Sequence, residues 1–220
     1  MPMFPLGSVL LPGAVLPLHV FEPRYRRLVQ DCLADNDHEF GVVLIERGVE
    51  VGGGDYRSMV GTVARMLQVA ELEDGRYALV TVGTRRINVK AWLPDDPYPL
   101  AVVEDWPDLD DSAGSHGSPA ERITAVAARV RHLNALAAEL GDPSADTTSE
   151  IRPDLLVASY QLSTLAPLGP ADRQRLLGAR GPSERMDLLD VALDEVEDML
   201  QFRLAHHAEG GATATDFDGP

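Results

Sequence analysis

The chain has 220 residues, enough for one or two domains that each bury a hydrophobic core. Its 35 acidic and 19 basic residues give a formal net charge of −16 at pH 7, and a field of that sign repels nucleic acids and anionic membranes at long range. No apolar run approaches the roughly 18 residues of a membrane span, and the single cysteine, Cys32, excludes an internal disulfide and a cysteine-built zinc site. We therefore expect a cytoplasmic protein without a membrane partner, and the charge argues against nucleic acid.

The opening of the chain predicts short strands followed by a helix. Pro5, Pro12 and Pro17 interrupt the apolar stretch up to Val20 and forbid a helix there, because proline lacks a backbone N–H and fixes its own φ. The leucines and β-branched residues between them fit short or edge strands. Pro23 then suits the first position of a helix, and helical spacing follows at Tyr25, Leu28, Val29 and Leu33.

Further short strands follow the helix. Asp74-Gly75 is a hairpin turn signal, and the apolar segments around it predict strands over Gly41–Glu46, Val60–Val69, Tyr77–Val82, Arg86–Ala91 and Leu100–Val103. Six or more short strands with one early helix are typical of a small closed or partly closed barrel.

The second half of the chain predicts helices. After an acidic, Gly- and Ser-rich stretch in which Trp106 is expected to pack back on a domain, apolar spacing predicts four helices over Pro119–Leu140, Asp154–Thr164, Pro170–Gly178 and Pro182–His206. The expected class is α+β. The expected units are a barrel over 1–107, a mobile acidic linker over 108–118, a helical subdomain over 119–208 and a disordered tail over 209–220.

Six segments in the first half resemble, in order, the N-terminal substrate-binding domain of the Lon protease family. They are FPLGSVLLPG (Phe4–Gly13), LPLHVFEPRYRRLV (Leu16–Val29), EFGVVLIERGVEVGGG (Glu39–Gly54), VGTVARM (Val60–Met66), DGRYALVTVGTRRINV (Asp74–Val89) and YPLAVVE (Tyr98–Glu104). A weaker helical resemblance runs through Ala158–Leu204. The resemblance implies a PUA-like β pseudo-barrel followed by an α-helical segment.

The catalytic parts of a Lon protease are not legible in this sequence. The ATPase needs a G-x-x-x-x-G-K-[ST] phosphate loop, and the peptidase uses a serine with a lysine base. The one lysine, Lys90, follows no glycine loop and falls in an expected strand. The resemblance therefore implies a stand-alone, non-catalytic recognition domain without a cofactor. It would bind unfolded or degron-bearing polypeptides, as an adaptor or by delivering clients to a separate ATP-dependent protease or chaperone.

A domain that binds unfolded polypeptide needs exposed apolar surface. Aromatic and methionine side chains suit such a surface because they supply area and adapt in shape. The candidates for polypeptide contact are Phe21, Tyr25, Met59, Met66, Leu67, Trp92 and Tyr98. For each of them, the alternative is a place in the core.

Glu22, Pro23 and Arg24 form a structural motif at the expected start of the first helix. The two charged side chains flank the proline, so an ion pair between them can lock the entry of the chain into the helix. An acid–base role for Glu22 is the alternative. None of the six histidines has the spacing of a zinc-binding helix, so no metal site is expected.

Three other functions stay open. A small-molecule ligand in the barrel is the first alternative, and RNA binding is the next. RNA binding would require a contiguous basic surface built from Arg24, Arg26, Arg27, Arg85, Arg86 and Lys90. A hydrolase whose residues meet only in space is the last. The sequence leaves the oligomeric state open.

Overall fold

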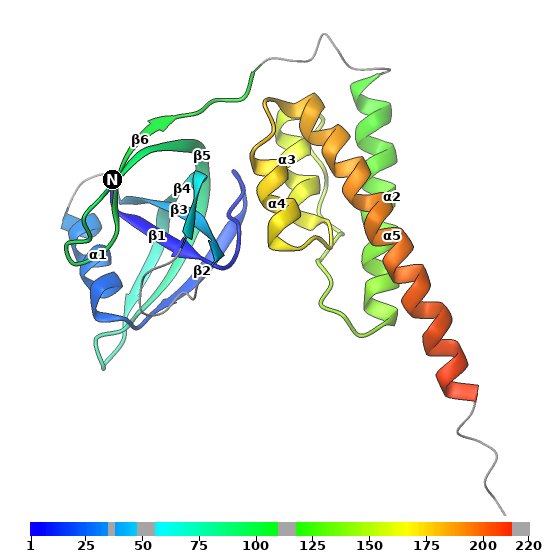
Figure 1. The fold of residues 1–220 in the computed structure, drawn as a ribbon, viewed down its shortest axis with the longest axis horizontal. Coiled ribbons are helices and arrows are strands. Elements are labelled where there is room, and N and C mark those ends of the chain that lie inside the picture. Colours follow the sequence, from blue (N-terminus) through cyan, green and yellow to red (C-terminus); the bar gives the residue numbers. More distant parts are fainter. Residues whose placement is uncertain (35–37, 48–55, 110–117, 213–220) are drawn as a thin grey trace, which may run out of the picture.

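The computed structural model describes residues 1–34, 38–47, 56–109 and 118–212, with side chains up to residue 206. These residues form an α+β fold in which a β-barrel and a helical half lie side by side (Figure 1). The strands are β1 (Met3–Leu6), β2 (Val15–Val20), β3 (Glu39–Arg47), β4 (Tyr56–Glu71), β5 (Tyr77–Leu93) and β6 (Leu100–Asp105). The helices are α1 (Pro23–Ala34), α2 (Pro119–Glu139), α3 (Leu155–Leu165), α4 (Pro170–Leu177) and α5 (Pro182–Ala212).

The barrel is built around one long strand, β5, which pairs with β4, β2 and β6. The sheet order is β1-β3-β4-β5-β2, with β6 also paired to β5. The first part of β5 pairs with β2, from Val82 opposite Val15 to Tyr77 opposite Val20, and its last part pairs with β6. Strand β1, which pairs in parallel with β3, also contacts the start of β6. There the Met3 amide donates to the Pro99 carbonyl at 2.9 Å. The result is a pseudo-barrel in which β2 is an edge.

The expectation of two separate strands on either side of Gly83 is wrong, because β5 runs through this glycine without a break. Gly83 is needed for a close approach. A Cβ there would lie 2.4 Å from the Leu11 carbonyl oxygen, and the Gly83 amide donates to the Ala14 carbonyl at 2.9 Å. The loop between β1 and β2 therefore lies directly on β5.

The barrel core lies beneath α1. Its buried residues include Phe4 and Tyr25, whose rings stack with centroids 4.1 Å apart, and Cys32 packs there as a small buried side chain. At the start of α1, Arg24 Nε lies 3.1 Å from Glu22 Oε2, and both side chains are largely buried. The predicted ion pair at the helix start is therefore present.

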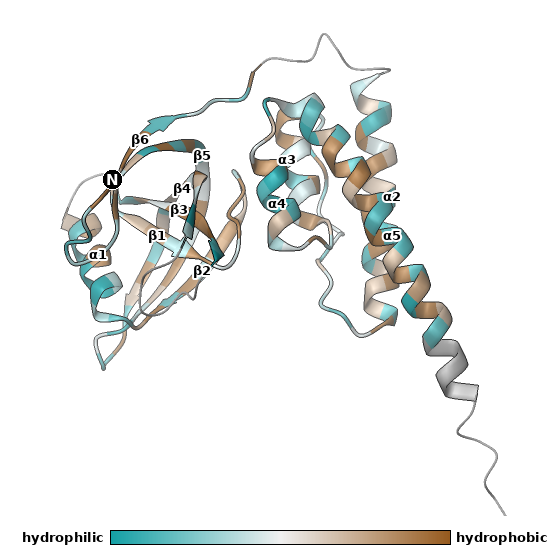
Figure 2. Ribbon diagram, in the orientation of Figure 1, coloured by the Kyte–Doolittle hydropathy of each residue, from teal (hydrophilic) through white to brown (hydrophobic). Residues whose placement is uncertain are grey.

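The four predicted helices of the second half are present, with ends within one or two residues of those expected except at the last. Helix α5 continues to Ala212, beyond the expected helix end at His206, and residues 213–220 lie outside the described residues. Helices α2 and α5 lie side by side, with α3 and α4 between them and the barrel (Figure 1). Apolar and polar residues alternate in bands along α2 and α5 (Figure 2), and the apolar ones fill a core of their own.

A buried polar group joins the two halves. We call it the Asp108 cluster, and it comprises Arg86 on β5, Asp108 after β6, Tyr160 on α3 and Arg185 on α5. Asp108 Oδ1 accepts from Arg185 Nη2 at 2.5 Å and lies 3.2 Å from Arg86 Nη2, while Oδ2 accepts from the Tyr160 hydroxyl at 2.6 Å. Arg185 is fully buried, and Arg86 is 3% exposed. One carboxylate thus ties the barrel to two helices.

Further contacts support this junction. Leu11 packs with Tyr160 and Leu177, and Gln174 Nε2 donates to Ser58 Oγ at 2.8 Å. The Leu109 amide donates to the Arg180 carbonyl at 2.8 Å. The expected start of a mobile linker at residue 108 is therefore wrong, because residues 108 and 109 are bound to the helical half; residues 110–117 lie outside the described residues.

Replacing Asp108 by asparagine should weaken the junction strongly. It removes the one carboxylate between two buried guanidinium groups, and breaking a buried pair in this way costs on the order of 3–5 kcal/mol. At roughly 2–4 °C per kcal/mol for a chain of this size, the melting temperature should fall by about 6–20 °C. The control is Asp105→Asn, whose side chain is 68% exposed in its pair with Arg85 and should contribute less than about 1 kcal/mol. Equal melting temperatures for the two variants would contradict a special role for Asp108.

Replacing Glu22 by alanine should lower the melting temperature by about 2–4 °C, because it removes a partly buried ion pair worth about 1 kcal/mol. The free energy of binding to any ligand should change less than the free energy of unfolding does. Thermal denaturation measures the effect, with Glu73→Ala in the exposed turn before β5 as the control. Unchanged stability together with lost ligand binding would make Glu22 a site residue.

Candidate functional site

A cleft of about 640 Å³ lies where the barrel meets α3. We call it the interlobe cleft. Its walls come from four segments that are far apart in the sequence. The lining residues are Pro12, Gly13, Thr84, Arg85, Arg86, Asp105, Trp106, Pro107, Asp108, Leu156, Val157, Tyr160 and Gln161. The cleft therefore exists only while the two halves are held together.

Local backbone features place each wall. Gly13 has a φ of +82°, which favours glycine, and its amide donates to the Gly83 carbonyl at 2.8 Å. This fixes the loop that carries Pro12 against β5. On the opposite wall, Asp154 caps α3 by accepting from the Val157 amide at 2.9 Å. The first turns of α3 then face the barrel.

The apolar side of the cleft is accessible. Leu156 is 38% exposed and Val157 is 42% exposed, although both lie on a helix that packs against a core. Trp106 lies at the end of β6 with its ring 4.4 Å from the Arg86 guanidinium carbon. The expectation that Trp106 packs back on a domain is confirmed.

The charged groups at the rim are paired. Arg85 contacts Asp105 at 2.9 Å and Glu39 at 2.7 Å. Burial raises the pKa of Glu39, but hydrogen bonds from Arg85 and Arg65 outweigh it, so the net pKa of this carboxyl is lowered and it stays ionised. Deeper in the cleft, burial and the hydrogen bond to Asp108 raise the pKa of Tyr160. Its hydroxyl is therefore a neutral donor at neutral pH.

Three of the residues expected to contact polypeptide are buried, so they do not contribute exposed surface. Tyr25 is 3% exposed because it stacks on Phe4. Met66 and Tyr98 are each 7% exposed, within the same barrel core. The Tyr98 hydroxyl donates to Asp31 at 2.9 Å, and burial together with this bond raises its pKa to about 12. We remove these three residues from the candidate surface.

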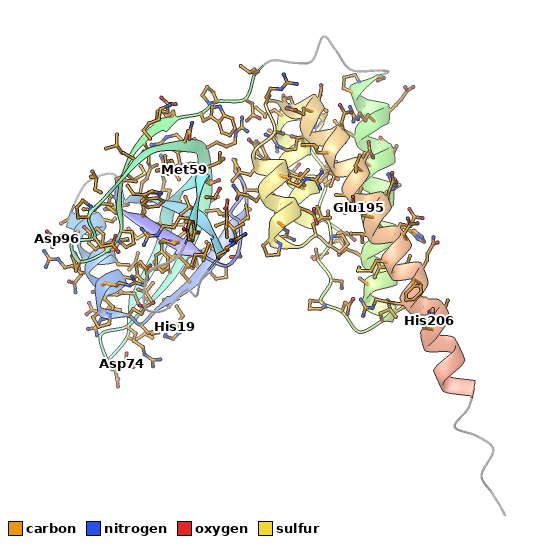
Figure 3. All side chains as sticks on the ribbon, in the orientation of Figure 1. His19, Met59, Asp74, Asp96, Glu195 and His206 are labelled. Atoms are coloured by element: carbon orange, nitrogen blue, oxygen red, sulfur yellow. The ribbon has the colours of Figure 1, made fainter. Side chains whose placement is uncertain are left out.

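The other candidates are accessible but lie outside the interlobe cleft. Phe21, Met59 and Leu67 are exposed. Met59 lies on β4 (Figure 3), between Ser58 and Val60, which both accept hydrogen bonds from Gln174 of α4. Trp92 is half-buried beneath Arg57, whose guanidinium carbon lies 4.7 Å from the ring centroid. A second hollow of about 150 Å³, between β1 and β2, is lined by Phe21, Glu22 and Tyr25 together with His19 and five further residues. A hollow of this size suits one apolar side chain rather than a longer segment of a client.

Sequence reasoning missed the residues that line the cleft on α3. Leu156, Val157 and Tyr160 were assigned to a helix without a site. A signal was present, because α3 opens with three consecutive apolar residues, Leu155 to Val157, whereas one buried helix face needs them only at every third or fourth position. Surplus apolar residues of this kind indicate a second, uncovered face.

Two of the histidines lie far apart. His19 lies on the barrel and His206 lies far along α5 (Figure 3). Within the described residues, no group of three or more His, Cys, Asp or Glu side chains could hold a metal ion. None of the described helices combines the length and apolar character needed to cross a lipid bilayer.

The basic residues that RNA binding would require do not form a free surface. Arg86 is buried, and four others are each paired with a carboxylate, namely Arg24 with Glu22, Arg27 with Asp31, Arg85 with Glu39 and Asp105, and Lys90 with Glu104. Together with the charge of −16, this arrangement disfavours a phosphate backbone.

Comparison with known proteins agrees with this architecture. Residues 1–195 match the model of the ATP-dependent protease La (LON) substrate-binding domain. Lon protease 2 of Sorangium cellulosum is 36% identical over 110 residues, which cover 49% of this chain and 14% of that protein. Lon protease 2 of Herpetosiphon aurantiacus is 27% identical over 215 residues, which cover 95% of this chain and 25% of that protein. The chain thus spans at most a quarter of the length of these two relatives.

A solved structure shows the same fold. The crystal structure of a Lon N-terminal domain protein from Xanthomonas campestris superposes with a TM-score of 0.60 at 28% identity, covering 87% of this chain and 96% of that one. The PUA-like barrel and the helices that follow it are therefore shared. Since the family model covers 195 of the 220 residues, this chain belongs to the Lon substrate-binding domain family.

Proposed function

We propose that this chain is a non-catalytic recognition domain that binds unfolded or degron-bearing polypeptides, and that the interlobe cleft holds an apolar segment of the client. It acts in the cytoplasm, as an adaptor or by passing clients to a separate ATP-dependent protease or chaperone. The observation that carries the proposal is the accessible apolar wall formed by Trp106, Leu156 and Val157. Membership of a family described by its substrate binding supports it.

The chemistry of the cleft suits an unfolded client. A folded protein keeps its apolar side chains inside, whereas an unfolded one exposes them next to a free backbone. Pro12, Trp106 and Pro107 offer rigid apolar contacts, and Gln161 offers an amide for the client backbone. The affinity should be modest, in the micromolar range or weaker, because an extended client loses conformational freedom on binding.

A small-molecule ligand is the second candidate. The volume of about 640 Å³ falls within the roughly 300–1,000 Å³ of ordinary ligand pockets. This function would give saturable binding of a metabolite and no preference between folded and unfolded protein.

The test compares one protein in two states. Reduced, carbamidomethylated α-lactalbumin stays unfolded, whereas the native calcium-bound form is folded. We expect the unfolded form to bind at least tenfold more tightly by fluorescence anisotropy. Binding should persist at moderate salt, because apolar contacts are weakly screened.

Variants of α3 connect the binding to the cleft. Leu156→Gln combined with Val157→Gln removes apolar area while keeping good helix formers, and should weaken binding of the unfolded form at least fivefold, with the melting temperature within about 2 °C. The control is Val191→Gln on α5, because Val191 is 48% exposed and lies outside the cleft. Equal binding by all variants would place the site elsewhere, and equal binding of folded and unfolded protein would refute the recognition of unfolded polypeptide.

A further inference from the structure

The Asp108 cluster holds one more positive charge than negative. Arg86 and Arg185 are both buried, and among the residues that the structure describes Asp108 is the one carboxylate that forms an ion pair with them. Tyr160 stays protonated and contributes no charge. Burial, reinforced by the nearby charge of Arg185, lowers the pKa of Arg86. An incompletely balanced charge in a buried place is costly, and an added carboxylate would relieve it.

The two arginines differ in how their donors are used. Arg185 donates from Nε to the Leu176 carbonyl, from Nη1 to Ser159 Oγ and from Nη2 to Asp108 and Tyr160. Arg86 donates only from Nη1, to the carbonyls of Leu177 and Ala179 at 2.7 and 2.5 Å. Its Nε and Nη2 are buried and have no hydrogen-bond partner among the described parts of the chain, although Nη2 lies within ion-pair distance of Asp108.

The geometry of these two nitrogens suits an oxyanion, and on an unmodified polypeptide that oxyanion is a carboxylate. Nε and Nη2 form one edge of the planar guanidinium group, and that edge receives a carboxylate through two parallel hydrogen bonds. Arg86 lines the interlobe cleft. We propose, on the basis of the proposed function, that the cleft recognises a carboxylate on the bound polypeptide and that this edge of Arg86 receives it.

Trp106 lies directly beside the Arg86 guanidinium group. Its ring lies 4.4 Å from the guanidinium carbon, and both unpartnered nitrogens are closed to solvent. In the empty cleft, the π-face of the indole partly balances the cation. A carboxylate that binds this edge lies close to the indole, and the emission of Trp106 therefore changes on binding.

The surroundings define the rest of the ligand. Pro12, Pro107, Leu156 and Val157 line the same cleft, so the carboxylate should sit beside apolar side chains. The chain as a whole carries a charge of −16, which repels strongly acidic segments. The ligand is therefore an apolar segment with a single carboxylate, supplied either by a C-terminus or by one Asp or Glu side chain.

Four 12-residue peptides of the same apolar sequence, all N-terminally acetylated, test the proposal. The first pair has a free C-terminal carboxylate or a C-terminal amide. The second pair is amidated and has one internal Glu or Gln. The protein is the full chain with Trp92→Phe, which leaves Trp106 as the sole tryptophan because the chain has two. Emission of Trp106 and titration calorimetry report binding.

We expect the carboxylate-bearing member of at least one pair to bind about tenfold more tightly and to change the emission of Trp106. A difference in the first pair identifies a C-terminal carboxylate, and a difference in the second identifies an acidic side chain. In Arg86→Lys, which keeps the charge but loses the planar edge, the difference should fall below threefold; in Arg203→Lys on α5 it should persist.

Binding of all four peptides within twofold of one another would overturn the carboxylate proposal and leave the proposed function standing, provided that the α3 variants still weaken it. Binding of none of the four would contradict both. Because the peptide pairs are compared on a protein with an intact Arg86, the test holds even if Arg86→Lys fails to fold.

Discussion

The contact between Asp108 and two buried arginines holds the barrel and the helical half in one arrangement. Asp108 follows β6, Arg86 belongs to β5 and Arg185 belongs to α5. The apolar contact of Leu11 with Tyr160 and Leu177 stabilises the junction. It does little to orient the two halves, because the hydrophobic effect is not directional. The hydrogen bonds of Asp108 fix the angle. The width of the interlobe cleft depends on this angle, since its walls belong to different halves.

A polar junction of this kind contributes more to the orientation of the two halves than to the free energy of unfolding. Well-packed hydrophobic residues can replace a buried ion pair with no loss of stability or with a gain. What the Asp108 cluster adds is a defined orientation and a guanidinium edge that its own hydrogen bonds leave unused. The same residues that join the halves thus place a positive charge at the cleft of a protein whose overall charge is strongly negative.

The sequence was sufficient for the barrel and for most helices, because their signals are local. Prolines before Val20, the Asp74-Gly75 turn and the apolar spacing after Pro119 each specify structure within a few residues. Gly83 misled because it looks like a strand break, whereas it accommodates the Leu11 carbonyl of a loop about seventy residues earlier. Tyr25, Met66 and Tyr98 were expected at the surface for their residue types, which do not show which face of a strand or helix is covered.

The cleft could not be predicted, because its residues are brought together only by the packing of the two halves. Asp108 looked like part of an acidic linker, and nothing local distinguishes it from Asp110 or Asp111 in the sequence. Its partners Arg86 and Arg185 are 22 residues before and 77 residues after it. The surplus apolar start of α3 was the one local sign of the cleft, and it becomes informative once the helix is known to face a barrel.

The central claim is that clients bind in the interlobe cleft, and site-specific photo-crosslinking tests it most directly. A benzoylphenylalanine in place of Val157 lies at the cleft, and one in place of Val191 lies at a similarly exposed position on α5. On illumination with unfolded α-lactalbumin, the account predicts a cross-link from position 157 and none from position 191, with the cross-link lost when native α-lactalbumin is used. Cross-links from position 191 alone, or equally from both positions, would contradict it.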